Sequence, residues 1–174
     1  VYGLAVWCPD CGEDIFVTHV EAESQVLRAM LNDVERRSTE LGPRVAARDI
    51  ENGLEDIVSI MEAALKAMTR RRLLADGHAL EDVDNTMAKK VRNRFQSYEG
   101  ATEMLAHLFS FDMTNVLDPA GADRFKHTLE KRHPITHNLG IVDRKYLEKV
   151  RTREAEGRDV NLSLIHISEP TRLR

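Results

Sequence analysis

Hydrophobic side chains recur every three or four residues along most of the chain, which predicts an all-α fold. A first helix is expected from Glu21 to about Leu41, and its apolar positions are Val26, Met30, Leu31 and Val34. Pro43 is suited to open a second, long helix. The apolar stripe of that helix is formed by Ile50, Leu54, Ile57, Val58, Met61, Leu65 and Met68.

The same periodicity predicts a third helix over 80–109, a fourth over 120–133 and a short last one over 144–150. Asp118 and Asp143 are suitable N-caps for the last two, because a short carboxylate can accept the free N–H groups of a first helical turn. Gly140 is expected to be a left-handed residue after the fourth helix. Together these elements predict a bundle of four to five helices.

Residues 1–20 have a different pattern, with apolar and β-branched residues on either side of the turn CPDCG. This pattern predicts two short strands, Leu4–Trp7 and Ile15–Val20, joined as a β-hairpin. Cys8 and Cys11 are the only cysteines, in the spacing of a zinc knuckle. Because zinc takes four ligands, we interpret this part as a truncated zinc ribbon whose other cysteine pair lay upstream. Two reduced thiols in a turn are the alternative.

The balance of 42% hydrophobic and 31% charged residues is that of a globular chain. A net charge of −4 argues against coating nucleic acid through overall charge and leaves room for a local basic site. Because no apolar run approaches the ~20 residues of a membrane helix and no signal segment is visible, we expect a cytoplasmic protein without a membrane partner. The tail over 162–174 resembles the translation of a sequencing-library adapter, which indicates an assembled metagenomic fragment truncated at both ends.

The candidate chemistry lies in the octapeptide KRHPITHN, residues 131–138. On a regular helix, Arg132 and His137 would point about 140° apart, at about 100° per residue. Pro134 cannot donate to the carbonyl of residue 130, so we expect a kink or break that brings the two side chains together. An arginine fork suits a phosphate, and a histidine can move a proton near neutral pH. Together, the two side chains supply the proton transfer and the charge stabilisation that metal-independent RNA cleavage requires.

The stretch KRHPITHNLGIVDRKYLEKV resembles the signature of HEPN domains, whose R-x4–6-H motif is often followed by N-x-G-x-V-D. The positions that match are Arg132, His133, His137, Asn138, Gly140, Val142 and Asp143. The upstream stretch NRFQSYEGATEMLAHLFSFDMTNVL is also similar to bacterial members, so the likeness spans about 45–150.

This resemblance implies a helical bundle that dimerises so that two such motifs line one cleft, and an RNA endonuclease of a toxin–antitoxin or other prokaryotic defence system. It implies catalytic Arg132 and His137, an assisting His133, and Asn138 as support for the fold or the cleft. RNA, a second copy of the chain and an antitoxin or other regulatory protein are the implied partners, and catalysis needs no cofactor. Since some HEPN domains are inactive, a non-catalytic nucleotide-binding or protein-interaction module is the alternative.

We therefore divide the chain into a knuckle remnant at 1–20, a linking helix at 21–42, a HEPN-like domain at 43–159 and a non-native tail at 160–174. One more feature is left open. The run TRRRL at 69–73, with Lys66 before it and Lys89, Lys90, Arg92 and Arg94 after it, is either a basic strip for RNA phosphates or a set of solvated helix faces. His107 has no partner at ligand spacing and is expected to be a surface or packing residue.

Overall fold

The computed structural model describes residues 8, 10–138, 141–149 and 156–158, except for the side chains of 114 and 136–138. In these ranges the fold is all-α, as predicted, with seven α-helices and without a strand. The α-helices are α1 (Phe16–Asn32), α2 (Val34–Leu41), α3 (Pro43–Ala75), α4 (Leu80–Thr86), α5 (Tyr98–Phe109), α6 (Pro119–Asn138) and α7 (Arg144–Lys149). Three shorter turns complete the path: the π-helical η1 (Met87–Val91) and the 3-10 turns η2 (Arg94–Gln96) and η3 (Met113–Asn115).

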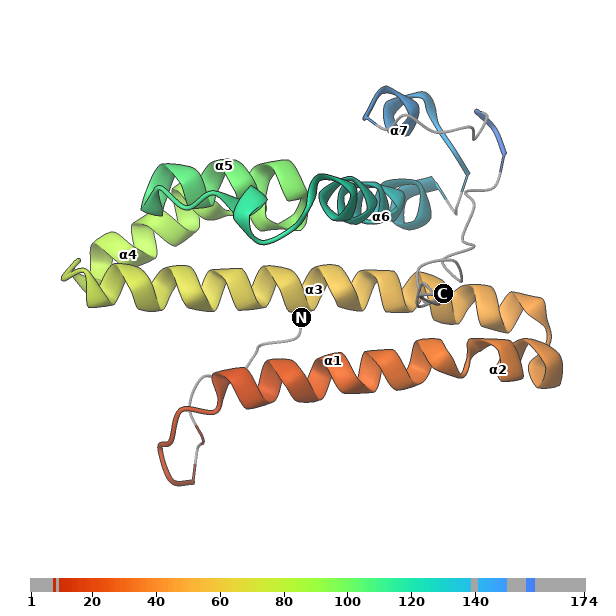
Figure 1. The fold of residues 1–174 in the computed structure, drawn as a ribbon, viewed down its shortest axis with the longest axis horizontal. Helices are drawn as coiled ribbons and strands as arrows, with labels where there is room; N and C mark the ends of the chain where they lie inside the picture. The colour runs from red at the N-terminus through yellow and green to blue at the C-terminus, as the bar shows by residue number, and fades with distance from the viewer. Residues whose placement is uncertain (1–7, 9, 139–140, 150–155, 159–174) are drawn as a thin grey trace, which may run out of the picture.

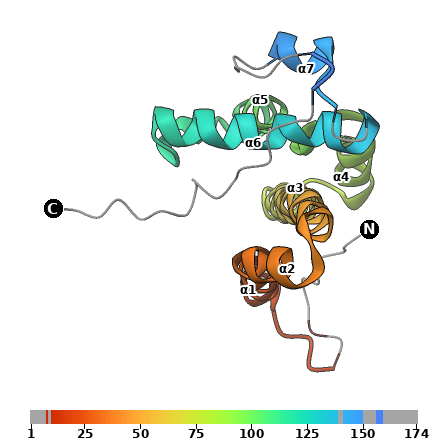
Figure 2. The same cartoon turned by 90° about the vertical axis from the view of Figure 1, so that its right-hand side faces the viewer.

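The long helix α3 is the spine of the molecule. Figure 1 shows α1 and α2 along one side of it and α4, α5 and α6 along the other. The view along the bundle in Figure 2 shows the same order, with α3 between the two groups and α7 outermost, beyond α6. The chain is therefore layered around one helix, and any site between α3 and α6 is built on two long elements.

The contact between α1 and α3 depends on a glycine. A Cβ added to Gly53 would lie 2.8 Å from Cδ2 of Leu31, so a larger residue would push the two helices apart. At the far end, Arg37 of α2 and the buried Asp49 of α3 form an ion pair at 2.8 Å. At the near end, Arg71 of α3 pairs with Asp14, and its guanidinium lies 5.7 Å from the ring centre of Phe16. These contacts fix both ends of the first layer to the spine.

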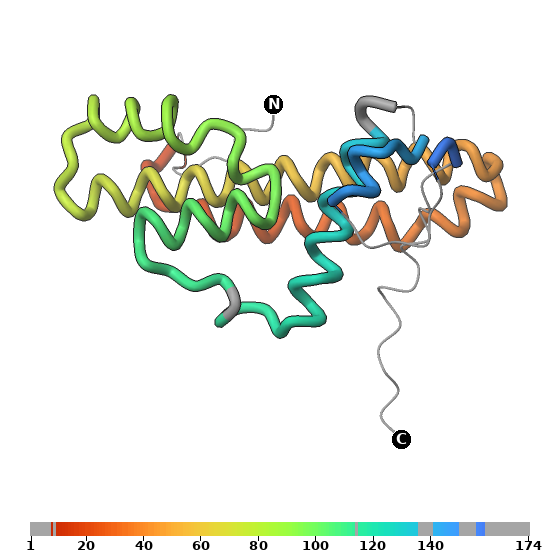
Figure 3. The backbone as a smooth tube through the Cα atoms, turned by 90° about the horizontal axis from the view of Figure 1, so that it is seen from above, coloured from red at the N-terminus to blue at the C-terminus, as the bar shows by residue number. Residues whose placement is uncertain are grey.

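The second layer has its own apolar core, which consists of Val91, Phe95, Ala101, Met104 and Leu105. Seen from above in Figure 3, α4 and α5 flank one half of α3, while α6 crosses the other half. A smaller cluster of Val142 and Tyr146, with Ile135 and Leu147 against it, attaches α7 to the end of α6. The turn η2 therefore lies where the two parts of this layer meet.

Several expectations about the elements are wrong. The strand expected over Ile15–Val20 is the start of α1: Phe16 is buried, His19 and Val20 are half-buried and Val17 is 64% exposed, which is helical spacing. The carboxylate of Asp14 accepts the N–H of Phe16 at 3.0 Å, which favours this helix start over a strand. The other expected strand, Leu4–Trp7, lies outside the described residues.

Two of the expected helices are also interrupted. The first divides at Asp33 into α1 and α2, and the third divides into α4, η1, η2 and α5. Two residues of the predicted apolar stripes lie at the surface, where Val26 is 66% exposed and Met68 is 54% exposed. The hydrophobic periodicity therefore predicted the helical segments but not the positions at which the first and third helices are interrupted.

Candidate functional site

The fourth predicted helix does not end at His133. α6 continues through Pro134 to Asn138, and the proline lies inside it with its side chain fully buried. A proline in this place cannot donate to the carbonyl of Glu130, yet the helix continues through it. The expected break is therefore absent, and the octapeptide is one helical segment.

Arg132 projects from α6 toward the spine and η2. Its Nε donates to Oε2 of Glu55 on α3 at 2.8 Å, and its Nη1 donates to Oε1 of Gln96 in η2 at 3.3 Å. The amide Nε2 of Gln96 in turn donates to Oε2 of Glu62 at 2.8 Å. The guanidinium side chain is 28% exposed, so it is held in one orientation and remains within reach of solvent.

His133 faces the start of α7. Its Nε2 lies 3.5 Å from Oδ2 of Asp143, whose Oδ1 accepts the backbone N–H of Tyr146 at 2.8 Å. Asp143 is therefore the N-cap of α7, as the sequence predicted, and it also fixes the imidazole beside it. Asp118 caps α6 in the same manner, accepting the N–H of Gly121 at 2.5 Å.

A cavity of about 180 Å³ brings these side chains together. It is lined by Gln96, Ser97, Leu129, Glu130, Arg132, His133 and Lys149. Glu130 is buried, and Nζ of Lys149 donates to its Oε2 at 2.9 Å, which links α7 back to α6. The cavity therefore combines a fixed guanidinium, an imidazole and an ammonium with one compensated carboxylate.

The electrostatics next to this cavity favour ionised groups. Burial of Glu99 on α5 works against its charge, but a hydrogen bond from Lys126, its own backbone N–H and the charges of Lys126 and Lys149 hold its pKa below the usual value. Lys126 has a raised pKa for the reciprocal reason, led by its hydrogen bond to Glu99. Three elements, α5, α6 and α7, thus contribute charged groups that are already paired.

Two of the candidate residues are described only in part, and one is not described. The backbones of His137 and Asn138 belong to the last turn of α6, and their side chains lie outside the described residues. Gly140, the expected C-cap, also lies outside them. The structure therefore brings Arg132 and His133 together at one cavity and places Asp143 beside His133.

Sequence reasoning missed Glu55, Gln96 and Lys149. Gln96 lies in the stretch NRFQSYEG that already carried part of the resemblance, so its neighbourhood was marked. Glu55 is one of several acids on α3, and nothing in the local pattern distinguishes it from Glu51 or Glu62. Glu55 becomes the partner of Arg132 only because α6 crosses α3 at that position.

The cysteine turn has part of the expected knuckle geometry. Gly12 adopts a φ of 72°, the N–H of Gly12 donates to the carbonyl of Cys8 at 2.8 Å, and Cys8 N–H donates to Glu13 at 2.8 Å. The N–H groups of Cys11 and Asp10, followed by the Cys11 side chain, lower the pKa of the Cys8 thiol. Such a turn suits two thiolate ligands, but in the described part of the chain no cluster of three or more His, Cys, Asp or Glu side chains could hold a metal.

Comparison of the chain with protein-family models, with curated proteins and with solved structures finds no match. Among the helices of the described ranges, none combines the length and the apolar character needed to cross a membrane.

Proposed function

We propose that this protein is a HEPN-like endoribonuclease that cleaves RNA without a metal ion. The observation that carries the proposal is the shared cavity of Arg132 and His133, in which the guanidinium is held by Glu55 and Gln96. These two contacts use Nε and Nη1, and in the described residues Nη2 has no bonded acceptor. Part of the fork is therefore available for an anion such as a phosphate.

His137 completes the proposed catalytic set. At about 100° per residue, position 137 is about 40° from position 133 around α6 and one turn further along it, so both positions lie on the same side of the helix. His133 lies between Arg132 and His137 in this projection and already lines the cavity. Without the expected break, Arg132 and His137 stay about 140° apart around α6, so the proposed set spreads over that arc with His133 between its two ends, and Asn138 supports the end of the helix.

The chemistry follows from these groups. His137 would take the proton from the ribose 2′-hydroxyl or give one to the leaving 5′-oxygen, with His133 assisting. Arg132 would stabilise the charge that develops on the phosphorus oxygens in the transition state. The 2′-oxygen then bonds to phosphorus as the bond to the 5′-oxygen breaks, which leaves a cyclic phosphate and a 5′-hydroxyl.

The test is RNA cleavage in EDTA by the wild-type chain and by Arg132→Ala and His137→Ala. Losing either group is expected to lower the cleavage rate by about 100-fold or more. His127→Ala is the matched control, because it removes a histidine from the same helix outside the cavity. Equal rates for all four proteins would refute the nuclease proposal.

The alternative is a non-catalytic nucleotide-binding or protein-interaction module. It is favoured by the ion pair between Arg132 and Glu55, which connects α6 to α3. In a non-catalytic protein this pair would serve only to stabilise the packing of the two helices. In that case Arg132→Ala lowers the melting temperature and the chain never cleaves RNA. Melting curves recorded beside the cleavage assay separate the two functions.

We propose RNA as substrate, a homodimer with a cleft shared between two copies, and an antitoxin or other protein as regulator. Cys8 and Cys11 would supply two of the four ligands of a structural zinc ion in a ribbon, with no part in catalysis. A native gene without a second cysteine pair upstream would refute the ribbon.

A further inference from the structure

A second concave region lies next to the Arg132 cavity and has a different charge. It is an open groove of about 840 Å³ between η1, η2 and α5. We call it the basic groove, and its polar lining includes Lys89, Lys90, Arg92, Arg94, Glu103 and His107. Four cations thus face one carboxylate.

Three of those cations are not neutralised. Lys89, Lys90 and Arg92 are exposed and have no carboxylate partner in the part of the chain that the structure describes. Arg94 pairs with Glu103 at 3.3 Å, but both side chains are more than half exposed, so the pair is weak. The groove is therefore positive without an internal counter-charge.

The neighbouring basic run is the opposite case. Arg70 pairs with Asp84, Arg71 with Asp14 and Arg72 with Asp76. Lys66 pairs with Glu62 at 2.6 Å. The sequence grouped all these residues as one candidate strip, and the structure divides them: the run at 66–72 is compensated within the fold, and the residues at 89–92 are not.

An unusual backbone gathers these cations. On a regular α-helix, positions 89, 90, 92 and 94 would spread over about 200° of the circumference. Instead the N–H of Arg92 donates to the carbonyl of Met87 at 3.0 Å, which closes a π turn, and Arg92 then adopts a φ of 43°. The fully buried Val91 and Phe95 hold this conformation from either side. Strained backbone of this kind persists where packing over-determines it, and it is concentrated at functional sites.

We propose that the basic groove binds the phosphate backbone of single-stranded RNA and leads the strand to the Arg132 cavity. The two regions are joined by η2, in which Arg94 lines the groove and Gln96, two residues later, lines the cavity and contacts Arg132. A cavity of about 180 Å³ is too small to admit a base-paired duplex, which favours a single strand. Delivery of the strand to the Arg132 cavity rests on the proposed nuclease function, whereas binding of RNA by the basic groove does not require cleavage.

The composition of the groove also predicts how it reads RNA. Its lining residues include no Phe, Tyr or Trp, and lysine and arginine cations predominate among its polar side chains. Lysine and arginine contacts to phosphates carry no sequence information and weaken steeply with salt. Binding is therefore expected to be independent of sequence and strongly dependent on salt.

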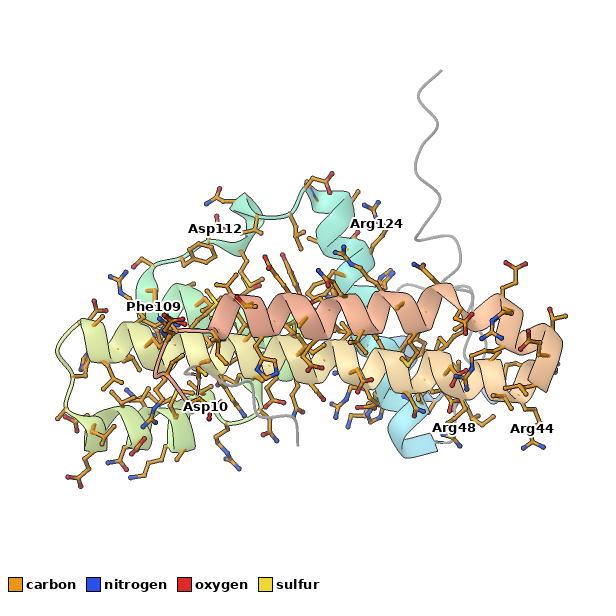
Figure 4. The ribbon with its side chains drawn as sticks, turned by 90° about the horizontal axis from the view of Figure 1, so that it is seen from below. Asp10, Arg44, Arg48, Phe109, Asp112 and Arg124 are labelled. Atoms are coloured by element: carbon orange, nitrogen blue, oxygen red, sulfur yellow. The ribbon has the colours of Figure 1, made fainter. Side chains whose placement is uncertain are left out.

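The experiment measures binding of a fluorescent 12-nucleotide RNA in which every 2′-hydroxyl is methylated, so that it cannot be cleaved by its own 2′-oxygen. The groove variant is Lys89→Gln/Lys90→Gln/Arg92→Gln. The matched control is Arg28→Gln/Arg44→Gln/Arg124→Gln, which removes the same charge from exposed positions outside the groove. Figure 4 shows Arg44 at one end of α3 and Arg124 on α6, both away from η1.

We expect the groove variant to bind at least about tenfold more weakly at physiological salt, and the control to change less than about twofold. The slope of log affinity against log salt should fall by about 2 in the groove variant, at about 0.7 per lost phosphate contact on a single strand. The double variant Lys89→Gln/Lys90→Gln keeps Arg92 and its turn unchanged, and should lose binding to an intermediate degree.

Equal losses in the groove variant and the control, or no loss in either, would overturn the proposal. Displacement of the RNA by equal concentrations of ATP or of polyglutamate would also overturn it, because the groove would then take a nucleotide or an acidic protein. Groove-dependent binding of the methylated RNA supports the proposal even where unmethylated RNA stays intact in EDTA. That last result would count against the proposed nuclease function alone.

Discussion

The Arg132 cavity and the basic groove are adjacent, yet they hold their charges in different ways. In the cavity, Arg132 is bonded to Glu55 and Gln96, and Lys149 to the buried Glu130. In the groove, the described residues give Lys89, Lys90 and Arg92 no carboxylate at all. A fixed cation can stabilise charge at one point, whereas exposed free cations can attract a polyanion and adapt to it. The difference therefore suggests that one region acts on a strand that the other captures.

Among the variants that test this contrast, the largest loss of cleavage rate is expected from a change to Glu55, which orients Arg132. Glu55→Gln keeps the side-chain shape but removes the charge that orients the guanidinium, and small misplacements of catalytic groups cost up to about 100-fold in rate. We expect cleavage to fall by about 10- to 100-fold and affinity for methylated RNA to stay within about twofold. Glu51→Gln, which affects the pair with Arg48, is the control. Unchanged cleavage in Glu55→Gln would show that Arg132 needs no positioning.

The second variant is expected to impair both the cavity and the groove, because η2 contributes residues to each of them. A Cβ on Gly100 would lie 2.3 Å from the carbonyl oxygen of Arg94, so Gly100→Ala must displace η2. We expect a loss of about 1–3 kcal/mol in the free energy of unfolding, as for other overpacked sites, with weaker RNA binding and slower cleavage together. Gly121→Ala is the control, since the atoms nearest to its Cβ are side-chain atoms away from η2, Oδ1 of Asp118 at 2.8 Å and Nη2 of Arg124 at 3.9 Å. Loss of one activity without the other would break the link through η2.

A smaller effect is expected where α7 closes the cavity. Lys149→Met leaves the buried carboxylate of Glu130 without its ammonium partner and should lower the free energy of unfolding by about 1–3 kcal/mol. The double variant Glu130→Gln/Lys149→Met removes the stranded charge and should recover much of this loss. Urea unfolding of the two single variants and the double gives the coupling energy. Strict additivity of the single effects would mean that the pair contributes nothing.

The smallest effect concerns an acidic residue outside both regions. Burial of Asp56, together with the charges of Glu23 and Glu55, raises its pKa, so the fold disfavours the ionised form. The stability that the protonated form provides is complete below the ordinary pKa of 3.8 and is lost as the pH rises through the raised value. Asp56→Asn should therefore raise the melting temperature at pH 7 by about 1–4 °C and leave it unchanged near pH 3.5. The exposed Asp82→Asn is the control, and a constant difference at every pH would contradict the assignment.

The sequence predicted the parts of this fold that depend on local chemistry. The long α3 behind Pro43, the caps at Asp118 and Asp143 and the short α7 are all confirmed, because each depends on residues a few positions apart. The strand over Ile15–Val20 was wrong because β-branched composition was weighed above the helical spacing of Phe16, His19 and Val20. Pro134 was expected to kink or break the helix; the break is wrong, because α6 continues through the buried proline.

The site was predictable to a lesser degree. The octapeptide marked Arg132 and His133, which do share a cavity, and the role of His137 stays a prediction. Glu55 is 77 positions away from Arg132 in sequence, and only the packing of α6 over α3 selects it from the other acids of that helix. The basic residues at 89–94 were recognised as a possible strip, but which cations are free depends on partners such as Asp14 and Asp84 that no spacing rule identifies.

The central claim is that the basic groove binds the RNA strand and the Arg132 cavity cleaves it. The most direct test is single-turnover cleavage in EDTA as a function of protein concentration. The proteins compared are wild type, Arg132→Ala and Lys89→Gln/Lys90→Gln/Arg92→Gln. We expect the groove variant to need about tenfold more protein to reach half-maximal rate and then to cleave as fast as wild type. We expect Arg132→Ala to reach half-maximal rate at the wild-type concentration but to stay about 100-fold slower at saturation. A groove variant that remains slow at saturation, or an Arg132→Ala protein as fast as wild type, would contradict this claim.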